Sequence, residues 1–371
     1  MNPRYNSETR RCSNSLKRLY MTVCKGIKTA TPHNAPALRA LVLLLPLLLG
    51  ATACVHEYPE EGCTRTRTLR LEFNTGFELM EYDYTEPSRA GESRYSKYSE
   101  PQGEMTYIIH AYPLVDGVVN PDKYESFEAT QTVAGSYDYS TTLHLDPGNY
   151  RLMAWAMFRV EGEYYYNASD FGDVTVKTDP YTGDTDYRDA FAGVLDVSIG
   201  GEESDGDMVV KMYRPLAKYE FIADDLKEFI ASEQKLNPGK QITLDDYYAV
   251  FSYPQFMPSE YNMFTEMPAD AVQGITYRSD LTTFGDDEIS LGFDYVFVNH
   301  MESSVMVRAA IYAKADDRVV AVTPMIQVPL LRSHDTLVRG KLLRIPSQDG
   351  VGIDPGFWGD FDLHAPLVEE K

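Results

Sequence analysis

Cysteine is scarce in this sequence of 371 residues. The four cysteines are Cys12, Cys24, Cys54 and Cys63, and the first two lie in a stretch with the character of a cleaved leader. If Cys54 carries a lipid, Cys63 has no partner and an internal disulfide framework is excluded. Without lipid, these two cysteines could close a small local loop. The fold must therefore be stabilised by buried apolar side chains rather than by covalent cross-links.

Basic side chains are also in short supply. The chain has 34 Lys and Arg against 56 Asp and Glu, which gives a formal net charge of −22 at pH 7. Such a surface repels nucleic acid and anionic lipid headgroups, so we expect no nucleic-acid partner. The hydrophobic content of 43% with 12% aromatic residues is too high for a disordered chain.

Motifs of known catalytic chemistry are missing. The sequence contains no G-x-S-x-G, no H-E-x-x-H, no P-loop and no C-x-x-C. The histidines are scattered, and His110 and His144 fall in strand patterns that suit structural roles. We therefore predict no enzyme, no cofactor and no metal site. Two alternatives stay open, because acids are plentiful: paired carboxylates for glycoside hydrolysis, and calcium at Asp205/Asp207 or at 286–288.

A long hydrophobic run is missing as well. The longest, residues 40–49, has 10 residues and is interrupted by Pro46, whereas a membrane-spanning helix needs about 20. Arg39 precedes this run and the small residues 51–53 follow it. That arrangement predicts a signal peptide over residues 1–53 rather than a membrane span. The leading segment is long for a signal peptide, so Met21 is an alternative start.

Cys54 directly follows the small residues. Ala51-Thr52-Ala53-Cys54 resembles the lipobox of bacterial lipoproteins, in which the thiol takes a diacylglyceryl group. We therefore predict lipidation at Cys54; the alternative is an ordinary secretory signal cleaved after Ala53. Residues 54–63 form a predicted acidic tether, and its glutamates resemble the signal that exports Bacteroidetes lipoproteins to the cell surface.

Strand patterns fill the rest of the chain. In "TLRLEFNT" Leu69, Leu71 and Phe73 alternate with polar residues, as in a half-buried strand. Residues 83–103 are polar and contain Pro and Gly, which predicts a long loop. Further strands are predicted at 105–114, 140–145, 149–160, 171–178, 207–213, 216–223, 244–253, 293–300, 304–314, 318–330 and 335–343.

One segment has helical spacing instead. Residues 224–236 place their apolar side chains on one helical face, begin with two aspartates and end before Asn-Pro-Gly. The regular short strands indicate an all-β fold of two tandem antiparallel β-sandwich domains, at 64–213 and 214–345, with this short helix in the second. Residues 346–371 form a C-terminal tail, whose alternation at 360–368 predicts an edge strand.

Five segments together resemble one known family. They are "DPGNYRLMAWA" (146–156), "YRPLAKYEF" (213–221), "GFDYVFVNHMESSVMV" (292–307), "VPLLRSHDTLVRGKLL" (328–343) and "GIDPGFWGDFDL" (352–363). Their order and spacing resemble the Bacteroidales fimbrillin-like lipoproteins, which are related to type V pilus subunits and fimbrial anchor proteins. The resemblance implies two transthyretin-like β-sandwiches in an outer-membrane lipoprotein, with Cys54 as the lipid site.

The resemblance also implies two modes of assembly. Stalk subunits of the pilus family lose an N-terminal segment to an arginine-specific protease, and a neighbour's strand then fills the groove. Arg65, Arg67 and Arg70 surround the first strand here and are candidate processing sites, although arginines on a solvent-facing strand surface are ordinary. Anchor proteins are expected to keep lipid and first strand, and the short interval from Cys54 to Cys63 looks more like that start.

We therefore expect a non-enzymatic, surface-exposed outer-membrane lipoprotein that acts as a fimbrial (pilus) subunit or anchor. Its expected partners are outer-membrane lipid through Cys54, other fimbrial subunits joined by strand pairing, and host or bacterial surface ligands in adhesion. The alternative function is a surface glycan-binding lipoprotein that uses tyrosines of 163–167 and 246–253, although only two tryptophans occur beside 27 tyrosines.

Overall fold

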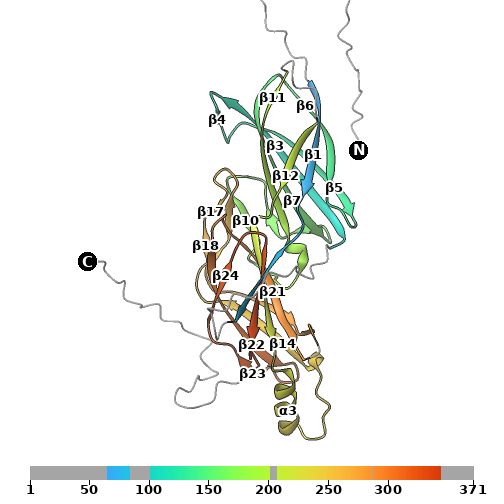
Figure 1. The fold of residues 1–371 in the computed structure, drawn as a ribbon, viewed down its shortest axis with the longest axis vertical. Helices are drawn as coiled ribbons and strands as arrows, with labels where there is room; N and C mark the ends of the chain where they lie inside the picture. The colour runs from blue at the N-terminus through green and yellow to red at the C-terminus, as the bar shows by residue number, and fades with distance from the viewer. Residues whose placement is uncertain (1–64, 84–100, 201–206, 286, 344–371) are drawn as a thin grey trace, which may run out of the picture. The chain divides into compact units, whose positions relative to one another are not determined.

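Strands dominate the computed structural model, which describes residues 65–83, 101–200, 207–285 and 287–343 (Figure 1). The part described contains one α-helix, α3 (Leu226–Leu236), and two short 3₁₀ turns, η1 (Asp186–Arg188) and η2 (Leu244–Asp246). None of its helices is long and apolar enough to cross a membrane. The prediction of an all-β, sandwich-like fold with one short helix is confirmed.

Two sheets from the first part of the chain enclose one apolar core. The smaller has the order β12 (Met208–Met212), β1 (Arg65–Phe73), β6 (Tyr139–Leu145). The larger has the order β11 (Ala190–Ile199), β7 (Gly148–Val160), β3 (Gly103–Val115), β4 (Val118–Val119), with β5 (Glu125–Val133) also on β3 and β8 (Glu163–Tyr164) on β7. We call the apolar cluster between these two sheets the first core; Leu71, Ile109 and Val210 are among its members.

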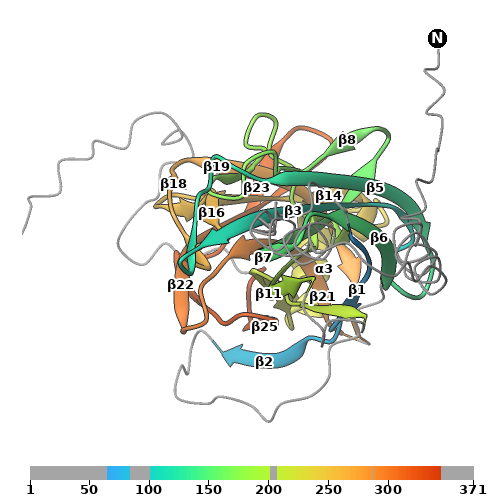
Figure 2. The same ribbon diagram turned by 90° about the horizontal axis from the view of Figure 1, so that it is seen from above.

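Two further sheets enclose the second core. One has the order β2 (Glu78–Asp83), β25 (His334–Gly340), β13 (Leu216–Ala223), β21 (Ile289–Phe297), β20 (Thr282–Thr283) (Figure 2). The other has the order β19 (Ile275–Asp280), β14 (Tyr247–Tyr253), β22 (Ser303–Ala313), β23 (Arg318–Val322), with β24 (Ile326–Leu330) also on β22. Phe221, Phe251 and Ile311 are fully buried between them.

Two small sheets complete the described strands. One has the order β17 (Met267–Pro268), β16 (Glu260–Asn262), β10 (Val174–Val176), β9 (Tyr166–Asn167), and the other pairs β15 (Met257–Pro258) with β18 (Ala271–Val272). The first of these joins strands from before and after position 214.

The central strands β3 and β7 are buried on both faces. In β7, Leu152 and Ala154 pack in the first core, whereas Met153 and Trp155 pack in the second. This explains why residues 149–160 are almost continuously apolar, since a strand covered on both sides needs no polar face. All described residues belong to one compact unit, Gly62–Lys371, and the predicted division at 213/214 stays a prediction.

Three strand pairs are parallel, which the sequence patterns did not predict. They are β1 with β12, β2 with β25 and β13 with β25; the other pairs between described strands are antiparallel. Although only residues 74–77 separate β1 from β2, the two strands belong to different sheets. A parallel pair needs a long crossover, so alternation in the sequence cannot reveal it.

Most predicted strands are present, with shifted ends. The predicted strand 171–178 shrinks to β10, 318–330 divides into β23 and β24, and 244–246 forms a 3₁₀ turn instead. Strands β2, β5, β11 and β19 were not predicted. The tail 346–371 and most of the predicted loop 83–103 lie outside the described residues.

The predicted helix forms, but its start is held differently from a usual N-cap. Asp225 lies at the N-cap position without a capping hydrogen bond, and its carboxylate accepts from the Leu343 backbone N–H instead, at 3.2 Å. Within the helix, buried Glu233 accepts from the Tyr247 hydroxyl and from Arg318, each at 2.9 Å. These contacts fix α3 against the sheets, so tertiary contacts rather than local capping set its position.

Candidate functional site

The residues predicted as sites fall in and before the first strand. Cys54 lies outside the described residues. Arg65 begins β1. Arg67 is buried, with 8% of its surface exposed, whereas Arg70 is exposed and forms an ion pair with Glu72 at 2.8 Å. Arg67 and Arg70 therefore differ in environment, and Arg67 does not lie on a solvent face.

The first strand is internal to its sheet. Leu69 is opposite Met208 of β12 on one side and Thr141 of β6 on the other. Leu69 and Leu71 are fully buried in the first core. Proteases nick exposed, mobile segments, whereas here the β1 backbone pairs with β6 over residues 65–71 and with β12 over residues 69–73. Cleavage after Arg67 or Arg70 would therefore require β1 to separate at least from β6.

A buried ion pair fastens the connection between β1 and β2. The Arg214 guanidinium donates to both carboxylate oxygens of Asp189 at 2.8–3.0 Å, and both side chains have 0% exposure. The same guanidinium donates to the carbonyl oxygens of Asn74 and Gly76, at 3.4 and 3.1 Å, and lies 3.9 Å from the centre of the Phe77 ring. Arg214 thus holds the chain where it passes between the two sheets.

Among the described strands, β2 lies at the end of its sheet and pairs only with β25 (Figure 2). Its start is held by the Glu78 N–H, which donates to the Ser333 carbonyl at 3.1 Å, and by the contact of Glu78 with His334 at 3.2 Å. Leu79 is buried against Ile222 and Leu337. Edge strands present unpaired backbone groups, so β2 is a candidate position for strand addition.

A second buried polar group lies in the second core. Asp294 Oδ2 accepts from the hydroxyls of Tyr181 and Tyr253 at 2.6 and 2.7 Å, and Oδ1 pairs with Arg188 at 2.9 Å. Tyr219 continues the chain of hydroxyls to Tyr253 at 2.8 Å. We call these five residues the Asp294 cluster. Burial raises the pKa of Asp294, while Arg188 and the tyrosine hydroxyls oppose the rise.

The Asp294 cluster has a structural role, because it connects separate elements and is buried. Arg188 belongs to η1, and it also donates to the Thr182 and Tyr295 carbonyl oxygens at 3.0 and 3.2 Å. The cluster thereby ties the segment around η1 to β21 and β14. Asp294 and Arg188 have 1% and 2% exposure, so a substrate could not reach them.

A neighbouring ionic group is less enclosed. Lys218 contacts Asp186 at 3.1 Å, and the Tyr295 hydroxyl donates to the same carboxylate oxygen at 2.5 Å. Glu220 is adjacent on β13, and burial raises its pKa to about 7, opposed by Ser290 and Lys218. Glu220 therefore changes its charge near neutral pH.

His110 is a core residue, as its strand pattern suggested. It has 2% exposure, and its ring stacks on Tyr124 and Phe171 at centroid distances of 4.2 and 4.0 Å. Nδ1 lies 3.0 Å from the Tyr112 hydroxyl. Burial lowers the pKa of His110 to about 4, opposed by the charge of Asp170. The imidazole is therefore neutral at physiological pH.

Most of the tyrosines named in the alternative, glycan-binding interpretation are buried. Tyr166 is 4% exposed and its hydroxyl donates to the Arg188 carbonyl at 2.6 Å. Tyr247 and Tyr253 lie in the second core. Their hydroxyls find buried acceptors, so the strand preference of tyrosine explains them better than ligand stacking.

The acidic residues considered for calcium do not converge within the described residues. Asp287 pairs with Lys227 at 2.7 Å and Glu288 pairs with Arg339. Asp286 and Asp205 lie outside the described residues, and Asp207 is exposed. Among the residues that the structure describes, no group of three or more His, Cys, Asp or Glu is arranged to hold a metal ion.

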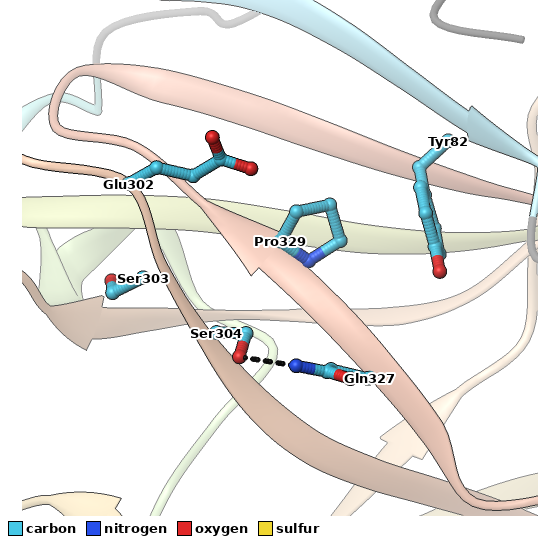
Figure 3. A pocket seen from close by; sticks show the side chains of 6 residues that line it. All are labelled: Tyr82, Glu302, Ser303, Ser304, Gln327 and Pro329. Atoms are coloured by element: carbon cyan, nitrogen blue, oxygen red, sulfur yellow. Dashed lines mark hydrogen bonds between the residues drawn. The ribbon is translucent and has the colours of Figure 1, made fainter. Parts of the chain in front are cut away.

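A shallow depression of about 380 Å³ lies beside β2 (Figure 3). It is lined by Tyr82, Glu302, Ser303, Ser304, Gln327 and Pro329. Sequence reasoning missed this group, because its members come from three separate strands and the loop before β22. It also missed Arg214, Arg188 and Asp294. The available signal was a single charge inside an apolar run, as Asp294 in "GFDYVFV", because such a charge must be paired if buried.

Comparisons with solved structures find distant likenesses. A candidate polysaccharide-binding protein from Bacteroides thetaiotaomicron is 13% identical, over 69% of this chain and 79% of that one, with a TM-score of 0.37. A candidate cell adhesion protein from Bacteroides ovatus is 11% identical, over 74% and 92%, with a TM-score of 0.37. The fimbrial anchor protein Mfa2 from Porphyromonas gingivalis is 12% identical, over 71% and 83%, with a TM-score of 0.33.

Identities of 13% or less and TM-scores of 0.37 or less do not support an inference of function. No curated protein sequence matched the chain at the significance required. A family model, described as a family of unknown function (DUF6562), matches residues 64–368. Because that match spans most of the chain, this protein belongs to the DUF6562 family.

Proposed function

We propose that this protein is a lipid-anchored protein of the outer cell surface that serves in a pilus or in adhesion as an anchor-type component. Two features support the proposal: the lipobox-like sequence that ends at Cys54, and a first strand built into the interior of its sheet. The second feature carries the choice of anchor over stalk subunit. A stalk subunit must give up its first strand, whereas here β1 contributes buried Leu69 and Leu71 to the first core.

The energetics favour retention of the first strand. Removal of one buried leucine side chain costs about 2–5 kcal/mol in protein cores. Loss of β1 would remove two such side chains and leave the edges of β12 and β6 unpaired. The Arg214–Asp189 pair further stabilises the C-terminal end of β1, because Arg214 donates hydrogen bonds to the carbonyl groups of Asn74 and Gly76.

Attachment to the membrane would come from the lipid on Cys54. Each buried CH₂ group contributes about 0.8 kcal/mol, so a single acyl chain binds a membrane only marginally and two or more attach a protein stably. Assembly with other subunits would use strand pairing, for which β2 offers an edge within the described residues. The segment 360–368, outside the described residues, is the second proposed pairing strand.

The proposal is tested by mass spectrometry of the protein isolated from native outer membrane. Trypsin should release residues 54–65 as one peptide, because Arg65 is the first lysine or arginine after Cys54. A diacylglyceryl group on Cys54 would add a defined mass to this peptide. The variant Cys54→Ser should lose the acyl mass and leave the membrane fraction. Cys63→Ser is the matched control, since it removes the other cysteine of the same peptide and should stay acylated.

Two results would contradict the proposal. A mature N-terminus directly after Arg65, Arg67 or Arg70 would indicate a processed stalk subunit. Retention of Cys54→Ser in the membrane at the level of the unaltered protein would show that lipid on Cys54 is not the attachment.

A further inference from the structure

The depression beside β2 has the composition of a small polar binding site. Tyr82 comes from β2, Ser303 and Ser304 from β22, and Gln327 and Pro329 from β24. Figure 3 shows the Pro329 ring between Tyr82 and the carboxylate of Glu302, with the Gln327 amide directed at Ser304. The volume of about 380 Å³ lies at the lower end of the range for small-molecule pockets, roughly 300–1,000 Å³.

The polar groups in this depression are available to a ligand. Within the described residues, the Tyr82 hydroxyl and the Glu302 carboxylate have no hydrogen-bond partner in the protein. Gln327 Nε2 donates to Ser304 Oγ at 2.9 Å, which holds both side chains in place. That bond leaves Gln327 Oε1 as an acceptor and the Ser304 hydroxyl as a donor. Donors and acceptors therefore lie around two apolar ring faces.

The strands beneath the depression disfavour an extended peptide. Ser304 is opposite Pro329, and Met306 is opposite Gln327, in the antiparallel pair of β22 and β24. The backbone groups that β22 and β24 turn toward each other are paired, Pro329 has no N–H to offer, and its carbonyl accepts from the Thr336 hydroxyl at 2.8 Å. At Pro329 recognition therefore relies on side chains, whereas strand addition depends on free main-chain groups.

The charge of the site disfavours anions. Glu302 is the only charged residue among the six that line it, and the whole chain carries a net charge of −22. A carboxylate accepts hydrogen bonds from hydroxyl or ammonium groups and repels phosphate, sulfate and carboxylate ligands. One carboxylate with two serines is also too few oxygen ligands for a calcium ion, which takes 6–8.

We infer that this depression binds a neutral or amino-bearing sugar unit of a glycan. The C–H face of the sugar would lie on the Tyr82 ring and against Pro329, and its hydroxyl groups would bond to Glu302, Ser304 and Gln327. Flat aromatic faces beside hydroxyl, amide and carboxylate groups match the alternating apolar and polar surfaces of a pyranose ring. This site is independent of lipidation at Cys54, so its test and the acylation test can fail separately.

The test uses the purified full-length protein and saturation-transfer-difference NMR. The neutral probes are maltohexaose, cellohexaose and acetylated chitohexaose, chitosan hexamer is the amino-bearing probe, and a heparin hexasaccharide is the anionic probe. At least one neutral or amino-bearing probe should bind saturably, and the heparin fragment should not. Tyr82→Ala and Gln327→Ala should each weaken that binding, the latter by about 3- to 10-fold as expected for one lost hydrogen bond.

Control variants separate local loss of binding from loss of folding. Tyr124→Ala removes a tyrosine that is 43% exposed outside the depression and should leave binding unchanged. Glu302→Gln keeps the shape of an exposed side chain, so the variant should fold. It should bind the amino-bearing probe more weakly, because the substitution removes the negative charge. The inference is overturned if no neutral or amino-bearing probe binds, or if binding survives both Gln327→Ala and Glu302→Gln. Saturable binding of the heparin fragment at this site would overturn the inference too.

Discussion

The two cores of this protein are built on different principles. The first core holds apolar and aromatic side chains, such as Leu69, Leu71 and Val210, and the buried Arg214–Asp189 pair lies at its boundary with the second core, between Phe191 and Phe77. The second core encloses the Asp294 cluster, with an ion pair and several tyrosine hydroxyls inside it. Apolar packing stabilises without strong geometric demands, whereas a buried polar network needs every partner in place. The second core should therefore tolerate substitution less well than the first.

The largest expected effect comes from breaking the Asp294 cluster. Asp294→Asn keeps the size of the side chain but removes the charge that pairs with buried Arg188. We expect a loss of about 3–5 kcal/mol in the free energy of unfolding, because an uncompensated charge is left in the interior. Urea denaturation followed by circular dichroism measures this loss.

A matched substitution shows whether burial is the cause. Asp280→Asn removes the carboxylate that pairs with Lys314 at 3.0 Å, but Asp280 is 73% exposed, so its cost should stay below about 1 kcal/mol. If both variants lose the same free energy, the distinction between the second core and the surface is wrong.

In the first core, Leu71→Ala should cost about 2–5 kcal/mol, because it leaves a cavity at a position with 0% exposure. Leu71→Met should cost less than about 1.5 kcal/mol, since volume and apolarity are kept. The same urea titrations measure both. A large loss in Leu71→Met would indicate that the first core also depends on exact shape, and would weaken the contrast between the cores.

The stability of the sheets around the second core should also depend on pH, through Glu220 on β13. Its pKa is raised from 4.5 to about 7 in the folded protein, so the folded state holds a proton that the unfolded state releases. Glu220 therefore contributes stability fully below pH 4.5, and this contribution is lost as pH rises from 4.5 through 7. Glu220→Gln should remove that decline, a difference of about 1–3 kcal/mol between pH 5 and pH 8. Thermal unfolding across this range measures it, and parallel pH curves for the two proteins would contradict the assignment.

The smallest effect on stability is expected from an exposed ion pair on the larger sheet of the first core. Arg151 and Asp196 form two hydrogen bonds at 2.7 and 2.8 Å between β7 and β11, but the Asp196 side chain is 52% exposed. Asp196→Ala should change the free energy of unfolding by less than about 1 kcal/mol, and less still in high salt. A loss above 2 kcal/mol, measured by urea denaturation, would contradict this prediction and show that the exposed pair stabilises the fold strongly.

The sequence was informative where a pattern is local. Alternation in Leu69, Leu71 and Phe73 revealed β1, and helical spacing revealed α3 within two residues of its start. The pairing partners of β1 stayed hidden, because period-two alternation marks a buried face but not the neighbouring strand. The tyrosines of 163–167 and 246–253 were ambiguous, since the same residue type suits both a core and a ligand platform.

What the sequence determined by itself is therefore the class of structure: an all-β, acidic chain, with a short apolar run that precedes a cysteine. Only the tertiary structure decided that β1 is an internal strand, that Arg214 meets Asp189 and that Arg188 meets Asp294. It also brought Tyr82, Glu302 and Gln327 around one depression. The physical reason is that periodicity reflects burial along one strand, whereas ion pairs and pockets depend on which distant strands become neighbours.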